Sequence, residues 1–373
     1  MKLLFVFGTR PEAIKMAPLI IELKKKPRRF EVKVCITGQH RQMLDQVMSF
    51  FNIDSDFDCN LMQPNQTLFD VTTNGLKHLE NVLSRYRPDI LFVQGDTTTA
   101  FVGALAAYYL QIKIAHLEAG LRSGKKYSPF PEEINRTIIG HIGDYHFAPT
   151  AKAVENLKHE GIINHVWNVG NTVIDALFAG LKIISKEKLD FTKEFHNIDF
   201  SKRLILITCH RRESFGGPLI DICRALKDIA VAYNDVELIY PVHLNPKVRK
   251  PVNEILRGQK NIHLLEPLDY PRLIWLMKKS YLVLTDSGGI QEEAPSLGKP
   301  VLVMREVTER IEGIEAGTAQ LVGTSREVIV RSTRQLLENR AAYKIMAEAI
   351  NPYGDGTASK KIVAILNKYD SSL

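Results

Sequence analysis

Three acidic residues in the first part of the chain stand where an α/β enzyme places groups that handle protons. Asp96 and Glu118 each follow a short apolar run that we expect to form a strand, and Glu132 begins a helix behind two prolines. Open α/β sheets bind ligands beside the carboxyl ends of their strands, and carboxylates on both sides of a substrate can remove and return a proton. The structural alternatives are that Asp96 caps the following helix and that Glu132 only complements the helix dipole.

Basic residues lie at two other expected strand-to-helix turns. Arg10 and Lys15 follow the first strand, and His210 and Arg211 follow the strand that opens a second series of elements. Backbone N–H groups at a helix N-terminus, together with cationic side chains, favour an anion such as a diphosphate. The alternatives here are a capped helix start with a solvated lysine, and an ion pair between Arg211 and Glu213.

A glycine-containing turn follows a later strand. In the run Thr285–Ala294, Gly288 and Gly289 would let backbone N–H groups approach a diphosphate, and a glutamate one turn further on can accept two ribose hydroxyls. No Gly-x-Gly-x-x-Gly fingerprint follows the first strand and the sequence has no Gly-Lys-Ser/Thr loop, which disfavours a tightly bound nicotinamide. The histidines also lack the His-Glu-x-x-His spacing of a helical zinc site. We therefore expect neither a cofactor nor a metal.

Two series of alternating strands and helices must position these residues. The strand runs are continuously apolar, which is typical of a parallel sheet that is covered on both faces. We therefore expect two doubly wound α/β domains that face each other across a cleft. The expected strands are Lys2–Phe7, Glu31–Ile36, Ile90–Gln94, Lys113–Leu117 and Tyr145–Ala148 in the first series, and Arg203–Thr208, Val236–Pro241, Ile262–Glu266, Tyr281–Thr285 and Pro300–Met304 in the second.

Changes in this pattern indicate the domain boundaries. The stretch Leu181–Lys202 is rich in Lys and Asp and has few strongly apolar positions. Near the end, Asn351–Gly356 breaks any helix before a last helical stretch at about Ala358–Lys368. We expect an N-terminal domain of residues 1–169, a C-terminal domain of residues 170–354, and a final helix of about 355–373 that returns to the first domain.

Composition narrows the class of protein. The chain has 373 residues with 49 Lys plus Arg against 42 Asp plus Glu, but these basic residues are not gathered into the arm or stripe of a nucleic-acid-binding protein. The first apolar stretch is too short for a signal peptide, and the longest other stretch, Phe101–Leu110, is too short to cross a membrane. The four cysteines form no Cys-x-x-Cys pair, which argues against a disulfide scaffold. We expect a cytoplasmic enzyme that binds neither nucleic acid nor membrane.

With these residues collected, the chain resembles the non-hydrolysing UDP-N-acetylglucosamine 2-epimerase family of bacteria. The resemblance covers essentially the whole chain and is most specific in the run Leu284–Met304. The other segments that carry it are Gly8–Pro18, Gly95–Thr99, Glu118–Arg122, Tyr127–Arg136, His210–Glu213 and Asn351–Gly356. It implies two Rossmann-like domains of the glycosyltransferase-B type with a central cleft, in which the second domain binds most of the UDP.

The resemblance also implies roles for individual residues. The positions that match residues implicated in catalysis are Asp96, Glu118, Glu132 and His210. The positions that match substrate and UDP contacts are Arg10, Lys15, Arg136, Arg211, Leu268, Leu273, Ser287, Gly288, Gly289, Glu293 and Arg310. Gln39 and Gln42 match a segment of a second site, at which UDP-N-acetylglucosamine acts as an activator. The family further implies a homodimer that works without a cofactor.

The implied reaction is reversible epimerisation at C2 of UDP-N-acetylglucosamine to UDP-N-acetylmannosamine, which supplies surface polysaccharide. The C2 hydrogen is not beside a carbonyl, so the implied route eliminates UDP to a 2-acetamidoglucal and then adds it back. Which of the three carboxylates acts first stays open. The alternatives are a hydrolysing relative, a glycosyltransferase of the same fold and, from the pI of 9.0 alone, a nucleic-acid-binding protein.

Overall fold

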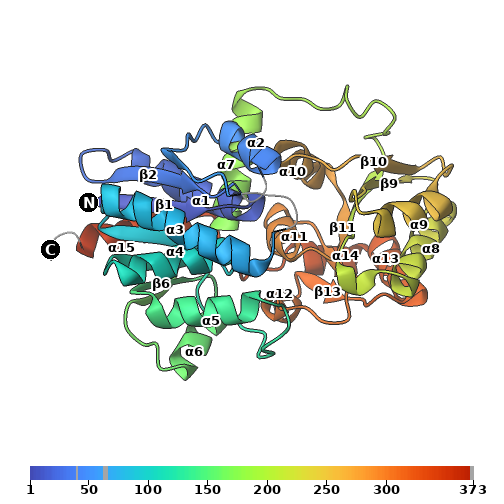
Figure 1. Ribbon diagram of the computed structural model, residues 1–373. Helices are drawn as coiled ribbons and strands as arrows, with labels where there is room; N and C mark the ends of the chain where they lie inside the picture. Colours follow the sequence, from blue (N-terminus) through green and yellow to red (C-terminus); the bar gives the residue numbers. More distant parts are fainter. Residues whose placement is uncertain (39–40, 62–65, 370–373) are drawn as a thin grey trace. The chain divides into compact units, whose positions relative to one another are not determined.

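The computed structural model describes residues 1–38, 41–61 and 66–369, which belong to two compact units (Figure 1). Unit 1 comprises Met1–Ala179 and Tyr353–Leu373, and unit 2 comprises Gly180–Pro352. Each unit contains one parallel sheet with helices packed on it. Unit 1 is therefore discontinuous in the chain, because unit 2 is inserted between its two parts.

The described part of unit 1 has a 7-stranded sheet in the order β3-β2-β1-β4-β5-β6-β7, with all neighbours parallel. The central strands are apolar and buried along almost their whole length, as expected of a sheet that is covered on both faces. The order reverses between β1 and β4, where such sheets bind ligands. The strands are β1 (Lys2–Phe7), β2 (Glu31–Ile36), β3 (Phe57–Asp58), β4 (Ile90–Gln94), β5 (Lys113–Leu117), β6 (Tyr145–Ala148) and β7 (Val166–Asn168).

Helices cover this sheet, and one core cluster joins Leu4 and Val6 of β1 with the apolar faces of α3 and α4. The last helix, α15, packs against α1, and Asp175 accepts hydrogen bonds from the backbone N–H groups of Ala358 (3.2 Å) and Ser359 (2.8 Å) at its start. The helices described in unit 1 are α1 (Arg10–Lys24), α2 (Arg41–Phe50), α3 (Leu68–Tyr86), α4 (Thr98–Tyr109), α5 (Glu132–Ile142), α6 (Ala151–His159), α7 (Thr172–Lys186, which continues into unit 2) and α15 (Ala358–Tyr369).

Unit 2 has a 6-stranded parallel sheet in the order β10-β9-β8-β11-β12-β13. Its core cluster joins Ile205 and Ile207 of β8 with α8, α9 and α13. The strands are β8 (Arg203–Thr208), β9 (Val236–Pro241), β10 (Ile262–Leu265), β11 (Leu282–Thr285), β12 (Val301–Val303) and β13 (Ala319–Leu321). The helices are α8 (Gly217–Ala232), α9 (Pro246–Leu256), α10 (Tyr270–Lys279), α11 (Gly288–Glu293), α12 (Ile311–Glu315), α13 (Arg326–Glu338) and α14 (Arg340–Ala347), with 3-10 turns at Arg212–Ser214 and Ala294–Leu297.

The structure confirms the parallel α/β class and the expected strands. Those of the first series have the expected bounds, and those of the second agree to within one residue at each end. Three strands were not expected, namely β3, β7 and β13, which lie at sheet edges and have only two or three residues each. Among the described residues, no helix is long and apolar enough to cross a membrane.

Candidate active site

The buried side chain of Glu12 ties the turn after β1 to the turn after β4. One of its carboxylate oxygens accepts hydrogen bonds from the backbone N–H groups of Gly8 (3.1 Å) and Thr9 (2.8 Å). The other accepts from the hydroxyl of Thr97 at 2.6 Å. Burial raises the pKa of Glu12, and the hydrogen bonds oppose that rise. Arg10, the first residue of α1, is thereby placed at the carboxyl ends of the central strands.

Glu118 directly follows β5 and lies in a buried polar network. The Nζ atom of Lys15 is 2.5 Å and 2.7 Å from its two carboxylate oxygens. The side-chain amide of Gln94 also donates to this carboxylate, as does that of Asn171 at 3.1 Å. The backbone of Glu118 has a φ of 63°, in the left-handed region that residues other than glycine seldom adopt. An ammonium and two amides therefore hold the carboxylate in one orientation.

Asp96 follows β4 and forms an ion pair with Arg136 of α5. Burial raises the pKa of Asp96, the guanidinium of Arg136 opposes the rise, and the charge of Glu118 adds to it. Lys15 and Glu132 also act electrostatically on Asp96, in opposite directions. Unit 1 therefore brings five of the expected site residues into one charged cluster, which we call the carboxylate cluster: Asp96, Glu118, Glu132, Lys15 and Arg136.

The two adjacent glutamates at the start of α5 have different surroundings. Glu133 accepts hydrogen bonds from the backbone N–H groups of Ser123 and Gly124, each at 3.0 Å, and so fixes the preceding loop. The Oε2 atom of Glu132 is buried and has no hydrogen-bond partner among the described residues. A buried carboxylate oxygen is costly without a partner. The Oε2 atom of Glu132 can therefore accept a hydrogen bond from a bound ligand.

Three structural alternatives are wrong, whereas Glu132 does lie in the first turn of α5, where an acidic residue also complements the helix dipole. Thr97, rather than Asp96, caps α4, because its hydroxyl accepts the N–H of Ala100 at 3.0 Å. Lys15 is not solvated, although a capping box does begin its helix. Glu213 pairs with Arg305 at 2.6 Å, and the described residues show no ion pair between Glu213 and Arg211.

In unit 2, the side chain of Asp286, which follows β11, is hydrogen-bonded to the turn after β8. Its Oδ2 atom accepts hydrogen bonds from the backbone N–H groups of His210 (2.6 Å) and Arg211 (2.7 Å). The imidazole of His210 is 41% exposed and stacks on that of His243, with ring centroids 5.5 Å apart. Burial lowers the pKa of His210, the charge of Asp286 opposes this, and Arg211 and His243 add to the lowering.

The guanidinium of Arg310 packs over the first turn of α11. A Cβ atom on Gly288 would lie 3.3 Å from the Arg310 Cζ atom, so a larger residue there would crowd the guanidinium. Arg310 donates to the buried Glu292 at 2.8 Å and to Glu309 at 3.0 Å. Burial disfavours the ionised form of Glu309, but Arg310 and Arg305 outweigh it and lower its pKa to about 2.

The remaining expected residues of unit 2 lie on two segments. Ser287 occupies the N-cap position of α11, and the two expected glycines are the first residues of that helix. Glu293 ends α11 and accepts a hydrogen bond from the hydroxyl of Tyr270 at 3.0 Å. Leu268 lies just before α10 and Leu273 lies within it, and both are half-buried. In the part of the chain that the structure describes, no group of three or more His, Cys, Asp or Glu could hold a metal.

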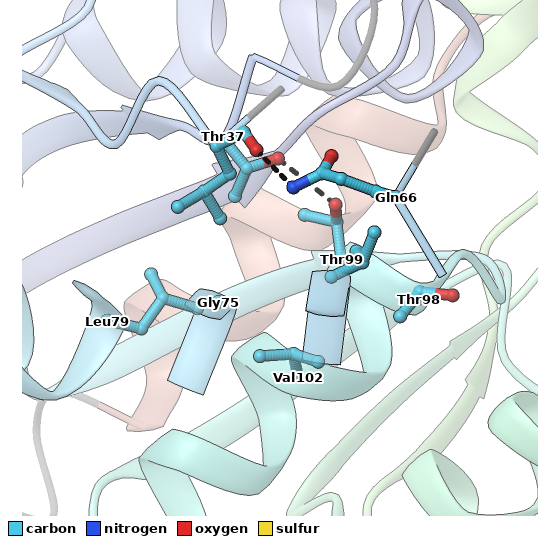
Figure 2. A pocket seen from close by; sticks show the side chains of 9 residues that line it. Thr37, Gln66, Gly75, Leu79, Thr98, Thr99 and Val102 are labelled. Atoms are coloured by element: carbon cyan, nitrogen blue, oxygen red, sulfur yellow. Dashed lines mark hydrogen bonds between the residues drawn. The ribbon is translucent and has the colours of Figure 1, made fainter. Parts of the chain in front are cut away.

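The expected activator site is only partly covered by the structure. Gln39 lies outside the described residues, and of Gln42 only its place in α2 is described. A cavity of ≈ 10 Å³ in unit 1 is flanked by the hydroxyls of Thr37 and Thr99, which lie 3.1 Å apart (Figure 2). It has room for about one water molecule. This cavity is therefore too small for a nucleotide sugar, and the carboxylate cluster does not line it.

Several of these contacts could not be found from the sequence. Asn171 and Glu118 are 53 residues apart, so no local spacing could pair them. Gln94 ends a predicted strand and Asp286 lies in a run that the resemblance includes, but position alone does not say what either side chain holds. Glu12 lies in a capping box, a pattern that predicts a helix start and not a link to Thr97.

Unit 1 carries a carboxylate cluster and unit 2 carries cationic and glycine-containing turns, each at the carboxyl ends of a parallel sheet. Two doubly wound units of this kind define an enzyme of the glycosyltransferase-B architecture. The spinosyn rhamnosyltransferase SpnG has a similar fold, with a TM-score of 0.60 over 98% of this chain and 100% of that chain at 16% sequence identity.

Known proteins of one family match this chain over its length. Residues 21–367 match the family described as UDP-N-acetylglucosamine 2-epimerase. The chain is 51% identical to the UDP-N-acetylglucosamine 2-epimerase of Escherichia coli (strain K12), with 100% of both chains covered. Its structure is similar to that of the UDP-GlcNAc 2-epimerase from Neisseria meningitidis bound to UDP-GlcNAc, with a TM-score of 0.93, 49% identity, and 99% and 100% of the two chains covered. The chain therefore belongs to the UDP-N-acetylglucosamine 2-epimerase family.

Proposed function

We propose that this protein reversibly epimerises UDP-N-acetylglucosamine at C2 to UDP-N-acetylmannosamine. The observation that carries the proposal is the carboxylate cluster at the carboxyl edge of one sheet, in a chain that is 51% identical to a named epimerase. Carboxylates around a sugar can move a proton from one face of the ring to the other. The Neisseria relative is bound to UDP-GlcNAc, which supports the same substrate here.

The proposed reaction proceeds by elimination and re-addition. The bond between C1 and the diphosphate oxygen breaks while a carboxylate takes the C2 proton, and a C1=C2 double bond forms in a 2-acetamidoglucal. A proton then returns to C2 on the opposite face, and the UDP oxygen bonds again to C1. The reaction is redox-neutral, and UDP leaves and returns intact.

The residues of unit 1 suit the proton transfers. Lys15 and two amides fix the orientation of the Glu118 carboxylate. A fixed orientation suits a base that must approach one particular hydrogen, that on C2 of the sugar. Burial raises the pKa of Asp96, so this carboxyl holds a proton at a higher pH than an ordinary aspartate. A carboxylate whose pKa is raised binds a proton more strongly when it acts as a base. Glu132 has an oxygen free of hydrogen bonds within the described residues and completes the set.

The residues of unit 2 suit UDP. The N–H groups at the start of α11, with Arg310 packed over them, favour the diphosphate, and Glu293 can accept ribose hydroxyls. We assign His210 and Arg211 to the departing diphosphate, because a cation there stabilises the charge that develops on the leaving group.

The experiment that tests the proposal is the conversion of UDP-N-acetylglucosamine in D2O, followed by NMR. We expect both epimers at equilibrium, with deuterium at C2 of the product. Retention of the original hydrogen in both epimers would contradict the proposal. Free sugar together with UDP would instead identify a hydrolysing enzyme, and transfer to an added acceptor would identify a glycosyltransferase, which shares the fold.

We further propose that UDP-N-acetylglucosamine activates the enzyme from a second site at Gln39 and Gln42. We also propose that the protein is a homodimer and that its product supplies a surface polysaccharide pathway.

A cytoplasmic location agrees with the four free, buried cysteines. The functional domains that we propose, residues 1–169 with 355–373 and residues 170–354, are supported by the division into two compact units, although the limits differ by up to ten residues.

A further inference from the structure

Asp286 and His210 lie at the carboxyl ends of two neighbouring strands in unit 2. Strands β8 and β11 are paired with Thr208 opposite Thr285, and the hydroxyls of these threonines are 2.6 Å apart. The backbone N–H of Asp286 donates to the carbonyl of Thr208 at 3.0 Å. The turn that carries His210 is therefore held at a fixed place relative to Asp286.

The two carboxylate oxygens of Asp286 have different surroundings. Oδ2 accepts the backbone N–H groups of His210 and Arg211. Oδ1 lies 3.5 Å from Nδ1 of His210 and accepts from no N–H or O–H group among the described residues, whereas the thiol of Cys209 is a weak donor to this carboxylate. The Asp286 side chain is 0% exposed, so a carboxylate oxygen without a strong donor is costly there. When Nδ1 of His210 carries a proton, it can donate to Oδ1. Active-site hydrogen bonds that are long in the unliganded protein shorten when a ligand binds.

We propose that Asp286 is a positioning residue for His210, whose Nδ1 proton it accepts so that the Nε2–H of a charged imidazole is left for the diphosphate. The inference rests on the function proposed above, in which His210 meets the departing diphosphate. A neutral imidazole with its proton on Nδ1 would present a lone pair on Nε2 to the anion. Both nitrogens must carry protons for this; burial leaves the pKa of His210 lowered in the absence of ligand, and the buried carboxylate and the incoming anion both favour the charged state.

The other groups that face His210 make this carboxylate necessary. Burial disfavours the charged imidazole, and so do Arg211 from the same turn and His243 from the segment after β9. The thiol of Cys209 also lies beside Asp286, but burial raises the pKa of that thiol well above its usual value, so it stays neutral. Asp286 is the group among these that favours the charge on His210.

The test measures the pKa of His210 by NMR titration of the histidine-labelled protein, with His210→Asn to assign the signal. Asp286→Asn removes the charge and keeps an oxygen that can accept a backbone N–H. We expect the pKa of His210 to fall by about 1 unit or more, the size of shift that an adjacent opposite charge produces. Glu213→Gln is the matched control: it removes a carboxylate from the same turn, one that pairs with Arg305, and should leave the pKa of His210 unchanged.

A folded Asp286→Asn protein with an unchanged pKa of His210 overturns the inference, and so does an equal shift in both variants. If Asp286→Asn does not fold, the inference is tested on the wild-type protein. Imidazole 15N shifts must place the proton of neutral His210 on Nδ1, and a proton on Nε2 overturns the inference. The titration uses no substrate, so it is independent of the conversion in D2O. A fall in the pKa without epimerisation supports the Asp286–His210 contact and refutes the proposed function.

Discussion

Within the carboxylate cluster, Lys15 and Glu118 form a buried ion pair whose disruption should be costly. Their side chains are 11% and 7% exposed, and the charged atoms are 2.5 Å apart. Removing one partner of a buried pair leaves an uncompensated charge, which costs about 3–5 kcal/mol. We expect Lys15→Met to lower the free energy of unfolding by about that amount and to reduce turnover, because Glu118 loses a donor that orients it. Urea unfolding and the rate of UDP-N-acetylglucosamine conversion measure the two effects.

The control for this variant is Lys152→Met. Lys152 pairs with Glu155 at 3.4 Å, and the two side chains are 61% and 58% exposed. Exposed pairs of this kind contribute about 0–1 kcal/mol. Similar losses of stability in the two variants would contradict the assignment of Lys15 and Glu118 as a buried pair.

Glu309 gives the free energy of unfolding a defined dependence on pH. Burial opposes its ionisation, but Arg310 and Arg305 prevail and lower its pKa from 4.5 to about 2. For a carboxyl with a lowered pKa, the stabilisation is present above the ordinary pKa and is lost as the pH falls toward the folded value. Between pH 6 and pH 3 we expect the wild type to lose about 2 kcal/mol more than Glu309→Gln. Urea unfolding at several pH values measures this, and parallel curves for the two proteins would count against it.

At the residue scale, the sequence predicts which side chains lie at strand ends but not what they contact. Asp96 and Glu118 do follow the predicted strands β4 and β5. Their partners are distant in the chain, since Lys15 is 103 residues from Glu118 and Arg136 is 40 residues from Asp96. Such pairs depend on the order of the strands, which alternation of strands and helices does not specify.

At the scale of the elements, the turn that follows β5 approaches α6 closely at Gly120. This residue has a φ of 88°, and a Cβ atom on it would lie 2.1 Å from the carbonyl oxygen of Ala153. Overpacking costs about 1–3 kcal/mol and left-handed strain about 1–2 kcal/mol. We expect Gly120→Ala to destabilise the protein by about 2–5 kcal/mol, and to lower turnover because the end of β5 with Glu118 must shift. Thermal and urea unfolding measure the first effect.

Gly124→Ala is the matched control for this substitution. Gly124 also has a positive φ, 70°, but a Cβ atom there would meet nothing within 4 Å. It should therefore cost only the strain of the left-handed conformation, about 1–2 kcal/mol. If both alanine variants were equally stable, the close approach of Gly120 to Ala153 would make no contribution to the loss of stability.

Element boundaries were predictable where burial or proline dictates them. The central strands are buried on both faces, so their sequences are continuously apolar and their ends are sharp. The short edge strands β3, β7 and β13 carry no such signal. The helix α11 ends at Glu293, and a 3-10 turn continues to Leu297. Pro295 lies in that turn and has no N–H to donate to an α-helical hydrogen bond.

At the scale of the whole molecule, activation by the substrate can be tested in the reverse direction. An effector activates only if it binds the competent state more tightly than the other. We expect the initial rate from pure UDP-N-acetylmannosamine to rise when a trace of UDP-N-acetylglucosamine is added, as measured by chromatography of the nucleotide sugars. Gln42→Ala should blunt the rise and leave UDP binding intact. A full reverse rate without the trace would show that this protein has no second site.

The proposed homodimer can be tested at an exposed apolar patch. Tyr108, Tyr109 and Leu110, at the end of α4, are 56%, 67% and 39% exposed. Contiguous exposed apolar side chains mark contact surfaces. We expect light scattering to give a dimer for the wild type and a larger monomer fraction for Tyr109→Glu. Val231→Glu, at an isolated position that is 68% exposed, is the control. A wild-type monomer would exclude the dimer.

The insertion of unit 2 within unit 1 determines when a newly made chain can become an enzyme. Translation completes Gly180–Pro352 before it reaches Tyr353–Leu373, the last part of unit 1. The carbonyl of Tyr353 accepts the backbone N–H of Asn171 at 2.7 Å, and the side chain of Asn171 in turn holds Glu118. A growing chain therefore cannot form this support for Glu118 until the whole of unit 2 has been synthesised. A chain that stops before Tyr353 lacks this contact, so the side chain of Asn171, and with it the orientation of Glu118, loses a support that comes from beyond unit 2.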